Sequence, residues 1–259
     1  MDPRALTTAA AFIRDQQFDA PADTGPVSFG PEDGPNFDEG PAQGAVVASN
    51  VVAFAQHTRV EVRDAVSDWM LFAQLVAAHK HPGGANTEGW SDAYLEVLRN
   101  TGWTLGEEVG SWTEERVTGS VVRQQILSLV AVALGPVPTA LAIVTAALNG
   151  LQKMHERSRW ITLFDRRGKS AKSVGFSVAA VEPFEHAVQV HSVDFRVEAR
   201  TVMTQVLFFK FTDSSASMFR RSTVLSLAAD AMQQLGPQIK TRVRDIASAN
   251  IAAYDLAEV

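Results

Sequence analysis

Residues 124–152 read QQILSLVAVALGPVPTALAIVTAALNGLQ, a stretch of 29 residues without a charged side chain. The group Gly135-Pro136-Val137-Pro138 divides this stretch, because proline lacks an amide donor and disfavours helical backbone in the residue before it. The pattern predicts a hairpin of two apolar helices over roughly 121–134 and 139–154. Each arm is shorter than the ~30 Å hydrocarbon core of a bilayer.

Two compatible interpretations of this hairpin follow. In the resting structure it is buried against a helix predicted at 49–79 and one face of a sheet, because so many uncharged residues in water would exceed the apolar patches that soluble monomers tolerate. Once released, it is a candidate membrane or lipid element. The residues assigned to that element are Ile126, Leu129, Val132, Leu134, Leu141, Val144 and Leu148.

Basic side chains concentrate directly after the hairpin. Residues 1–120 carry a formal net charge of −11, whereas residues 121–259 carry +5. The basic run is a candidate anionic-surface patch, and the alternative is a solvated loop that complements the acidic half of the chain. Its members are Lys153, Arg157, Arg159, Arg166, Arg167, Lys169 and Lys172.

A period of two residues follows this run and is typical of strands. The alternation is clearest in Ala187–Ala199, although its phase reverses near Val190, which predicts a bulge or an earlier loop there. The pattern predicts an antiparallel sheet followed by C-terminal helices. The predicted strands are Trp160–Phe164, Val174–Val181, Ala187–Ala199, Val202–Phe211 and Ser217–Leu225, and the predicted helices are Ala228–Leu235 and Pro237–Ala252.

The N-terminal half is predicted to be mainly helical. Residues 19–44 interrupt it as an arm rich in proline, glycine and aspartate, whose two aromatic residues, Phe29 and Phe37, are candidate anchors on the domain or on a neighbouring subunit. The predicted helices are 4–18, Ser49–His79 and Ser91–Arg99.

The sequence thus predicts an α+β fold: a helical N-terminal half, a central apolar helical hairpin, an antiparallel sheet and C-terminal helices. Residues 1–44 form the N-terminal helix and arm, and residues 45–259 form a single domain. Within that domain, 45–155 is mainly helical, 156–227 holds the sheet and 228–259 holds the last helices.

None of the motifs that would carry catalysis or bind a cofactor is complete in this sequence. The chain has no cysteine, so disulfides, thiolate catalysis and cysteine-ligated metals are excluded. Gly168-Lys169-Ser170 resembles the end of a phosphate-binding loop, but Leu163 stands where the motif needs glycine. His79 and His81 lack a fixed third metal ligand. We therefore predict no catalytic residue, no metal and no cofactor.

Three short stretches, in this order, carry a resemblance: AYLEVLRNTGW at 93–103, LFDR at 163–166 and VLFFKF at 206–211, with the uncharged hairpin between the first two. With this layout, the chain resembles the bacterial virulence factor Evf and related toxin-like proteins over roughly residues 45–250. The resemblance implies an α/β fold, no known enzymatic activity and a lipid on a buried cysteine. Because this sequence has no cysteine, that covalent lipid cannot be carried over.

The leading functional hypothesis is a non-enzymatic effector of virulence or toxin type that acts through a lipid, membrane or protein surface. The alternative is a self-assembling structural or cargo protein, a homo-oligomer held together through residues 19–44. A second alternative is an enzyme with an unrecognised site. We predict no nucleic-acid partner. The opening MDPRALTTAAAF is not a secretory signal, which predicts a protein that is cytoplasmic as synthesised, with export only by a route without a cleaved signal.

Overall fold

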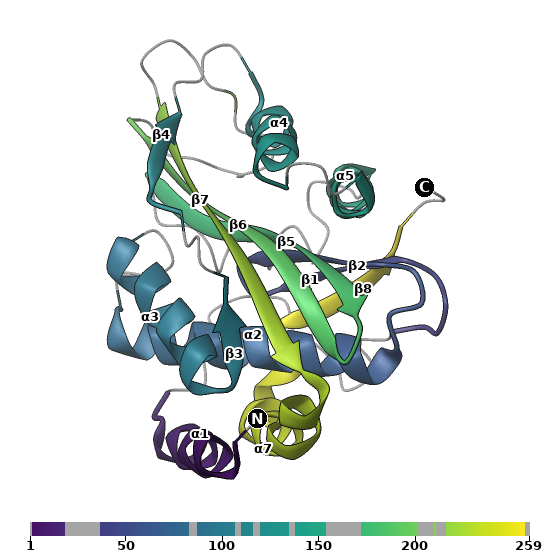
Figure 1. Ribbon diagram of the computed structural model, residues 1–259. Coiled ribbons are helices and arrows are strands. Elements are labelled where there is room, and N and C mark those ends of the chain that lie inside the picture. Colours follow the sequence, from purple (N-terminus) through teal and green to yellow (C-terminus); the bar gives the residue numbers. More distant parts are fainter. Residues whose placement is uncertain are drawn as a thin grey trace.

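The computed structural model shows a sheet between two helical layers (Figure 1). One layer holds α2 (Val60–Lys80), α3 (Glu88–Asn100), α7 (Ala229–Ala247) and α1 (Pro3–Asp15), and the other holds α4 (Val122–Leu134) and α5 (Pro138–Lys153). Each layer buries its own hydrophobic core against the sheet. The structure describes residues 2–18, 37–82, 87–106, 110–115, 120–134, 138–153, 172–200, 210 and 216–256.

The sheet runs in the order β3-β7-β6-β5-β2-β1-β8, with β4 also paired to β7. The pairing of β2 with β5 is parallel, and the other pairings among the described strands are antiparallel. The strands are β1 (Gln43–Val47), β2 (Asn50–Phe54), β3 (Trp103–Leu105), β4 (Thr113–Glu115), β5 (Ser173–Phe184), β6 (Ala187–Ala199), β7 (Ala216–Ala228) and β8 (Ile251–Asp255).

The α+β class and the hairpin bounds are confirmed. However, the sheet is mixed, and it extends beyond the predicted 156–227 at both ends of the chain. β1 begins at the end of the predicted arm, and β2 occupies the first turns of the helix predicted from Ser49. Ile251–Asp255 forms β8, where the C-terminal helical region was predicted. Both runs are short and apolar, and periodicity alone does not separate a buried strand from a buried helix. Two predicted strands, Trp160–Phe164 and most of Val202–Phe211, lie outside the described residues.

The change of phase in β6 has a different cause from the predicted bulge. The register of β6 with β5 and with β7 is continuous from Ala187 to Ala199. Val188 and Val190 belong to the core under α2 and α7, whereas Val193 and Phe195 belong to the core under α4 and α5. The hydrophobic pattern reverses because opposite layers cover the two ends of one regular strand.

Helix α7 is continuous through Pro237, where a second helix was predicted to begin. Its buried residues Ala231, Leu235, Ile239 and Val243 recur every four positions on both sides of the proline. This single apolar stripe packs on the core, and tertiary packing outweighs the local cost of proline in a helix.

The C-terminal end of the predicted arm is held by a buried arginine. The Arg63 guanidinium donates to the carbonyls of Thr58 and Pro41 and to Gln43 Oε1, at 2.7, 2.6 and 2.6 Å. Phe37 is buried with its ring edge-on to Phe54, 5.3 Å between centroids. Phe37 therefore anchors this segment as predicted, whereas residues 19–36, including Phe29, lie outside the described part of the chain.

Candidate functional site

The predicted lipid element forms the whole α4–α5 layer. Ile126, Leu129, Val144 and Leu148 are buried, and Leu141 is half-buried. Val132 points the other way, with 67% of its surface exposed. The side chain of Leu134 lies outside the part of the structure that is described. Between Gln124 and Gln152 the hairpin thus has a buried face and an exposed face, and neither carries a charged side chain.

Beneath this layer the sheet presents a continuous apolar face. α5 packs on β2, β5 and β1, and α4 packs on β6. At its centre the rings of Phe176 and Phe195 stack, with centroids 5.3 Å apart. The expected packing against the helix at 49–79 is wrong, because α2 covers the opposite face of the sheet. The buried sheet residues of this face are Val46, Val51, Ala53, Val174, Phe176, Val178, Ala180, Val193, Phe195, Val197 and Met218.

A side-chain hydrogen bond ties the hairpin to the sheet through Tyr254 of β8. Its hydroxyl donates to the carbonyl of Ala147 in α5 at 3.1 Å. The Tyr254 ring lies over Gly44 of β1, where an added Cβ would come within 2.3 Å of the ring, so only glycine leaves room for it. A second hydrogen bond, from Arg123 Nη1 to Asn149 Oδ1 at 2.7 Å, joins α4 to α5 and does not reach the sheet.

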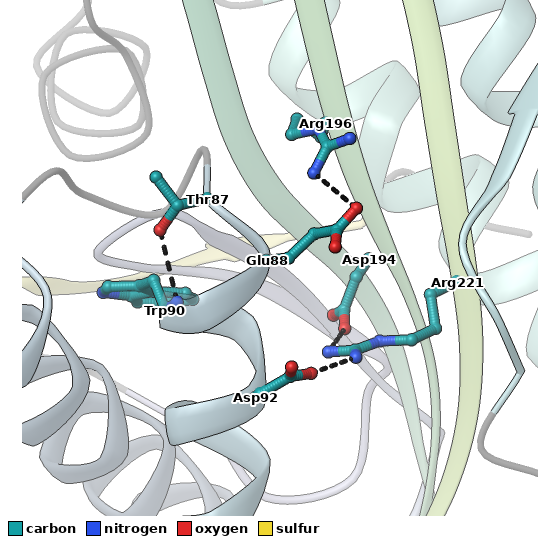
Figure 2. Close-up of polar contacts among 7 residues, drawn as sticks. All are labelled: Thr87, Glu88, Trp90, Asp92, Asp194, Arg196 and Arg221. Atoms are coloured by element: carbon teal, nitrogen blue, oxygen red, sulfur yellow. Dashed lines mark hydrogen bonds and ion pairs between the residues drawn. The ribbon is translucent and has the colours of Figure 1, made fainter.

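Ion pairs attach the opposite layer to the sheet (Figure 2). The buried Arg221 of β7 lies 2.6 Å from Asp92 of α3 and 3.4 Å from Asp194 of β6. Arg196 of β6 pairs with Glu88 at the start of α3, at 3.1 Å. Ion pairs of this kind fix the position of a helix more strictly than apolar contact, because they are directional.

Trp112 lies beside these ion pairs, and one of their members, Asp194, has a raised pKa. The Trp112 ring lies near both guanidinium groups, 5.2 Å from Arg196 and 5.0 Å from Arg221. Burial raises the pKa of Asp194 to about 6, although Arg221 opposes the shift by its charge and its hydrogen bond. The sequence does not indicate this network, because strand pairing and helix packing bring Asp194 and Arg196 to partners that are distant in the chain.

The two layers are therefore held to the sheet in different ways. α3 is fastened by ion pairs that converge on Arg221 and Arg196. The hairpin between Gln124 and Gln152 has no charged residue with which to make an ion pair, and it rests on apolar contact and the Tyr254 hydrogen bond. Of the two layers, the α4–α5 layer is the one for which an apolar solvent could replace the sheet as the contact surface.

The predicted anionic-surface patch is mostly outside the described residues. Arg157, Arg159, Arg166, Arg167 and Lys169 fall in the segment 154–171, and the side chain of Lys153 is also outside the description. Lys172 is exposed immediately before β5. The assignment of this run to a membrane or other anionic surface therefore stays a prediction.

Within the described ranges, no three histidine, aspartate or glutamate side chains are grouped so that they would hold a metal ion. His79 and His81 lie at the end of α2, as the sequence indicated. None of the described helices combines the length and the apolarity that crossing a membrane requires.

The comparison with solved structures returns two toxins and Evf, the protein that the sequence resembles, all at low similarity. No protein-family description matches the chain, and no curated protein does. Among solved structures, a delta-endotoxin matches with a TM-score of 0.43 and 12% identity, covering 79% of this chain and 91% of its own. The activated Cyt2Ba monomer from Bacillus thuringiensis subsp. israelensis has a TM-score of 0.33 and 12% identity, over 61% and 93% of the two chains. The Evf virulence factor has a TM-score of 0.31 and 10% identity, over 98% and 91%.

Proposed function

We propose that the protein is a non-enzymatic effector of toxin or virulence type that acts on a lipid surface through its α4–α5 layer. The observation that carries this proposal is a helical hairpin, uncharged from Gln124 to Gln152, that covers the apolar residues on one face of the sheet. The sequence left a lipid, a membrane or a protein surface open as the target. We choose a lipid surface, and we assign the contact with it to the α4–α5 layer.

In water the hairpin stays on the sheet. Burying one large apolar side chain is worth about 1.5–3 kcal/mol. Ile126, Val144, Leu148, Phe176 and Phe195, all buried in this interface, then account for roughly 7–15 kcal/mol. Release therefore needs a second apolar medium, and a lipid surface provides one.

The insertion would be shallow. α4 has 13 residues and α5 has 16, which gives helices of ~20 and ~24 Å against a hydrocarbon core of ~30 Å. Helices of these lengths do not reach across the hydrocarbon core, so the hairpin would enter it only in part. The basic run at 153–172 follows α5 directly, and each cation that reaches an anionic surface would add about 1 kcal/mol to docking.

Because the chain has no cysteine, one engineered cysteine gives a unique label. We would place a nitrobenzoxadiazole dye on Val132→Cys, which is exposed on α4, and on Ala78→Cys, which is exposed at the end of α2 in the other layer. On vesicles of phosphatidylcholine with phosphatidylglycerol, emission from position 132 should rise and shift to the blue, while emission from position 78 stays unchanged. An equal response at both positions would refute the assignment to this layer.

A matched pair of variants tests the same layer without a label. Val132→Asp places a charge on the face that would enter lipid, and Val132→Thr keeps the shape of the side chain without a charge. Both should fold, because the site is exposed. Vesicle leakage should fall with Asp and persist with Thr. If wild-type protein neither binds nor permeabilises anionic vesicles at any pH or after proteolysis, the hairpin is only core, and assembly through residues 19–44 takes its place.

A further inference from the structure

The layer opposite the hairpin contains a cleft of about 930 Å³. It is bounded by the start of α2, by α7 and by the turn between β5 and β6. Part of its wall is apolar, with Val62, Ala65, Val188, Met232 and Pro237 among the lining residues. A cavity of this size and character holds a small organic molecule.

Two aspartates one helical turn apart line the cleft from α2. Asp64 and Asp68 are at positions i and i+4, so their side chains lie on one face of the helix. Asp68 is only 8% exposed, yet among the described residues no donor makes a hydrogen bond or close ion pair with its carboxylate. Asp68 therefore presents a largely buried carboxylate to the cleft, and the charge of Lys240 acts on it only from beyond ion-pair distance.

The α7 side of the cleft offers a backbone acceptor. Pro237 has no amide hydrogen, so it cannot donate the helical hydrogen bond to the carbonyl of Gln233 four residues earlier. Both residues line the cleft. The α7 wall therefore includes a residue, Gln233, whose carbonyl lacks its usual helical donor.

The rim of the cleft holds two strained residues. His57 and Glu185 have positive φ values of 62° and 45°, a region that side chains other than glycine rarely occupy. They lie in separate loops, before α2 and between β5 and β6, and both line the same cleft. Backbone strain of this kind concentrates at ligand sites, where the fold holds a loop in place for binding.

We propose that this cleft binds a small-molecule organic cation, a protonated amine on an apolar body, with its ammonium group between Asp64 and Asp68. An ammonium has three donors and can bond both carboxylates and a carbonyl together. Two carboxylates do not make a metal site, and within the described residues no group large enough to hold a metal ion occurs here. The inference does not depend on the hairpin, which lies on the other side of the sheet.

The charges that face these aspartates come from every wall of the cleft. α2 adds Glu61, the loop before it adds His57 and Arg59, the β5–β6 turn adds Glu185 and His186, and α7 adds Lys240. Burial raises the pKa of Asp68 to about 7, the neighbouring Asp64 adds to this, and Lys240 opposes it. Binding of an amine should therefore be strongest near pH 8 and weaken as Asp68 gains a proton below pH 7.

The test compares three six-carbon probes that differ only in the polar group: hexylammonium, hexan-1-ol and hexanoate. Calorimetric titration of the full chain at pH 8 should show saturable binding of hexylammonium alone, and binding at pH 5 should be weaker. Asp68→Asn should lower the affinity for hexylammonium about tenfold or more, the loss of one charge-assisted hydrogen bond. Asp245→Asn, an exposed position of α7, and Val132→Asp, on the hairpin, are matched controls that should bind as wild type does.

The proposal is overturned if wild-type protein does not bind hexylammonium, if hexan-1-ol binds equally well, or if Asp68→Asn leaves the affinity unchanged. Thermal unfolding of Asp68→Asn separates lost binding from a lost fold, because a folded variant that no longer binds locates the effect in the cleft. Vesicle leakage by the hairpin should be the same in wild type and in Asp68→Asn, so failure of one proposal leaves the other standing.

Discussion

Replacing Asp68 with asparagine should make the unliganded protein more stable at pH 8. The carboxylate is buried beside Asp64, and its pKa rises from the ordinary 3.8 to about 7 in the fold. Each pKa unit corresponds to about 1.4 kcal/mol. The difference between 3.8 and about 7 therefore gives at most about 4 kcal/mol of destabilisation from the ionised form. Asparagine removes the charge but keeps polar atoms to be buried, so we expect a gain of about 1–4 kcal/mol.

The gain should depend on pH in a defined direction. The folded state binds the Asp68 proton more tightly than the unfolded state, so between pH 3.8 and about 7 wild-type stability falls as pH rises. Below pH 3.8 the aspartate is protonated in both states, and the advantage of asparagine should vanish. The advantage should be complete above pH 7, where the aspartate is charged in both states.

Urea unfolding at pH 8, 6 and 4 measures this difference between variant and wild type, in which the titration of other groups largely cancels. Asp245→Asn, with an exposed side chain, should show almost no difference at any of these pH values. Destabilisation by Asp68→Asn at pH 8, or a difference that does not change with pH, would refute the reasoning. The carboxylate would then be a structural group with a partner, and the amine site would lose its main support.

Two further predictions concern the attachment of the layers. Arg221→Met should cost about 3–5 kcal/mol at pH 8, because it leaves Asp194 buried without its partner. Urea unfolding should show a smaller cost at pH 5, where Asp194, with a pKa of about 6, is mostly neutral; an equal cost at both would contradict a charge effect. Tyr254→Phe removes the hydrogen bond to Ala147 and should cost about 1 kcal/mol. It should also raise the rate of vesicle leakage, and an unchanged rate would show that this contact does not hold the hairpin.

Part of the fold could be predicted because its signals are local. The α4–α5 hairpin was placed within about a residue of its observed bounds, since proline and the absence of charge mark it in the sequence. β6 occupies the predicted Ala187–Ala199, because its residues alternate with a period of two on both sides of the phase change near Val190. The β1–β2 hairpin was missed because the buried runs of Gln43–Val47 and Asn50–Phe54 carry no alternation. The parallel pairing of β2 with β5 joins segments more than 100 residues apart, which periodicity cannot detect.

The candidate sites also divide into one that local sequence signals predict and one that they do not. The hairpin could be singled out because its residues are contiguous. The amine cleft could not, since Asp68, Glu185 and Pro237 come from three distant segments, and the exposure of an aspartate cannot be inferred from helical spacing. The spacing of Asp64 and Asp68 indicates only that they share one face of α2. Only the tertiary structure, in which α7 and the β5–β6 turn line the same cleft, leaves Asp64 half-buried and Asp68 buried.

The two layers also restrict what could release the hairpin. Acid neutralises Asp68 and Asp194, whose pKa values burial has raised, so protonation favours the folded state of the layer that contains α2 and α3. Lowering the pH from 8 to 5 should therefore strengthen that layer. The hairpin from Gln124 to Gln152 has no titratable side chain, so acid cannot act on it directly. A trigger for insertion must then act at the ends of the hairpin, because its charged neighbours and its covalent connections to the rest of the chain lie only there. At those ends, either the basic run at 153–172 meets an anionic surface or a protease cuts the chain.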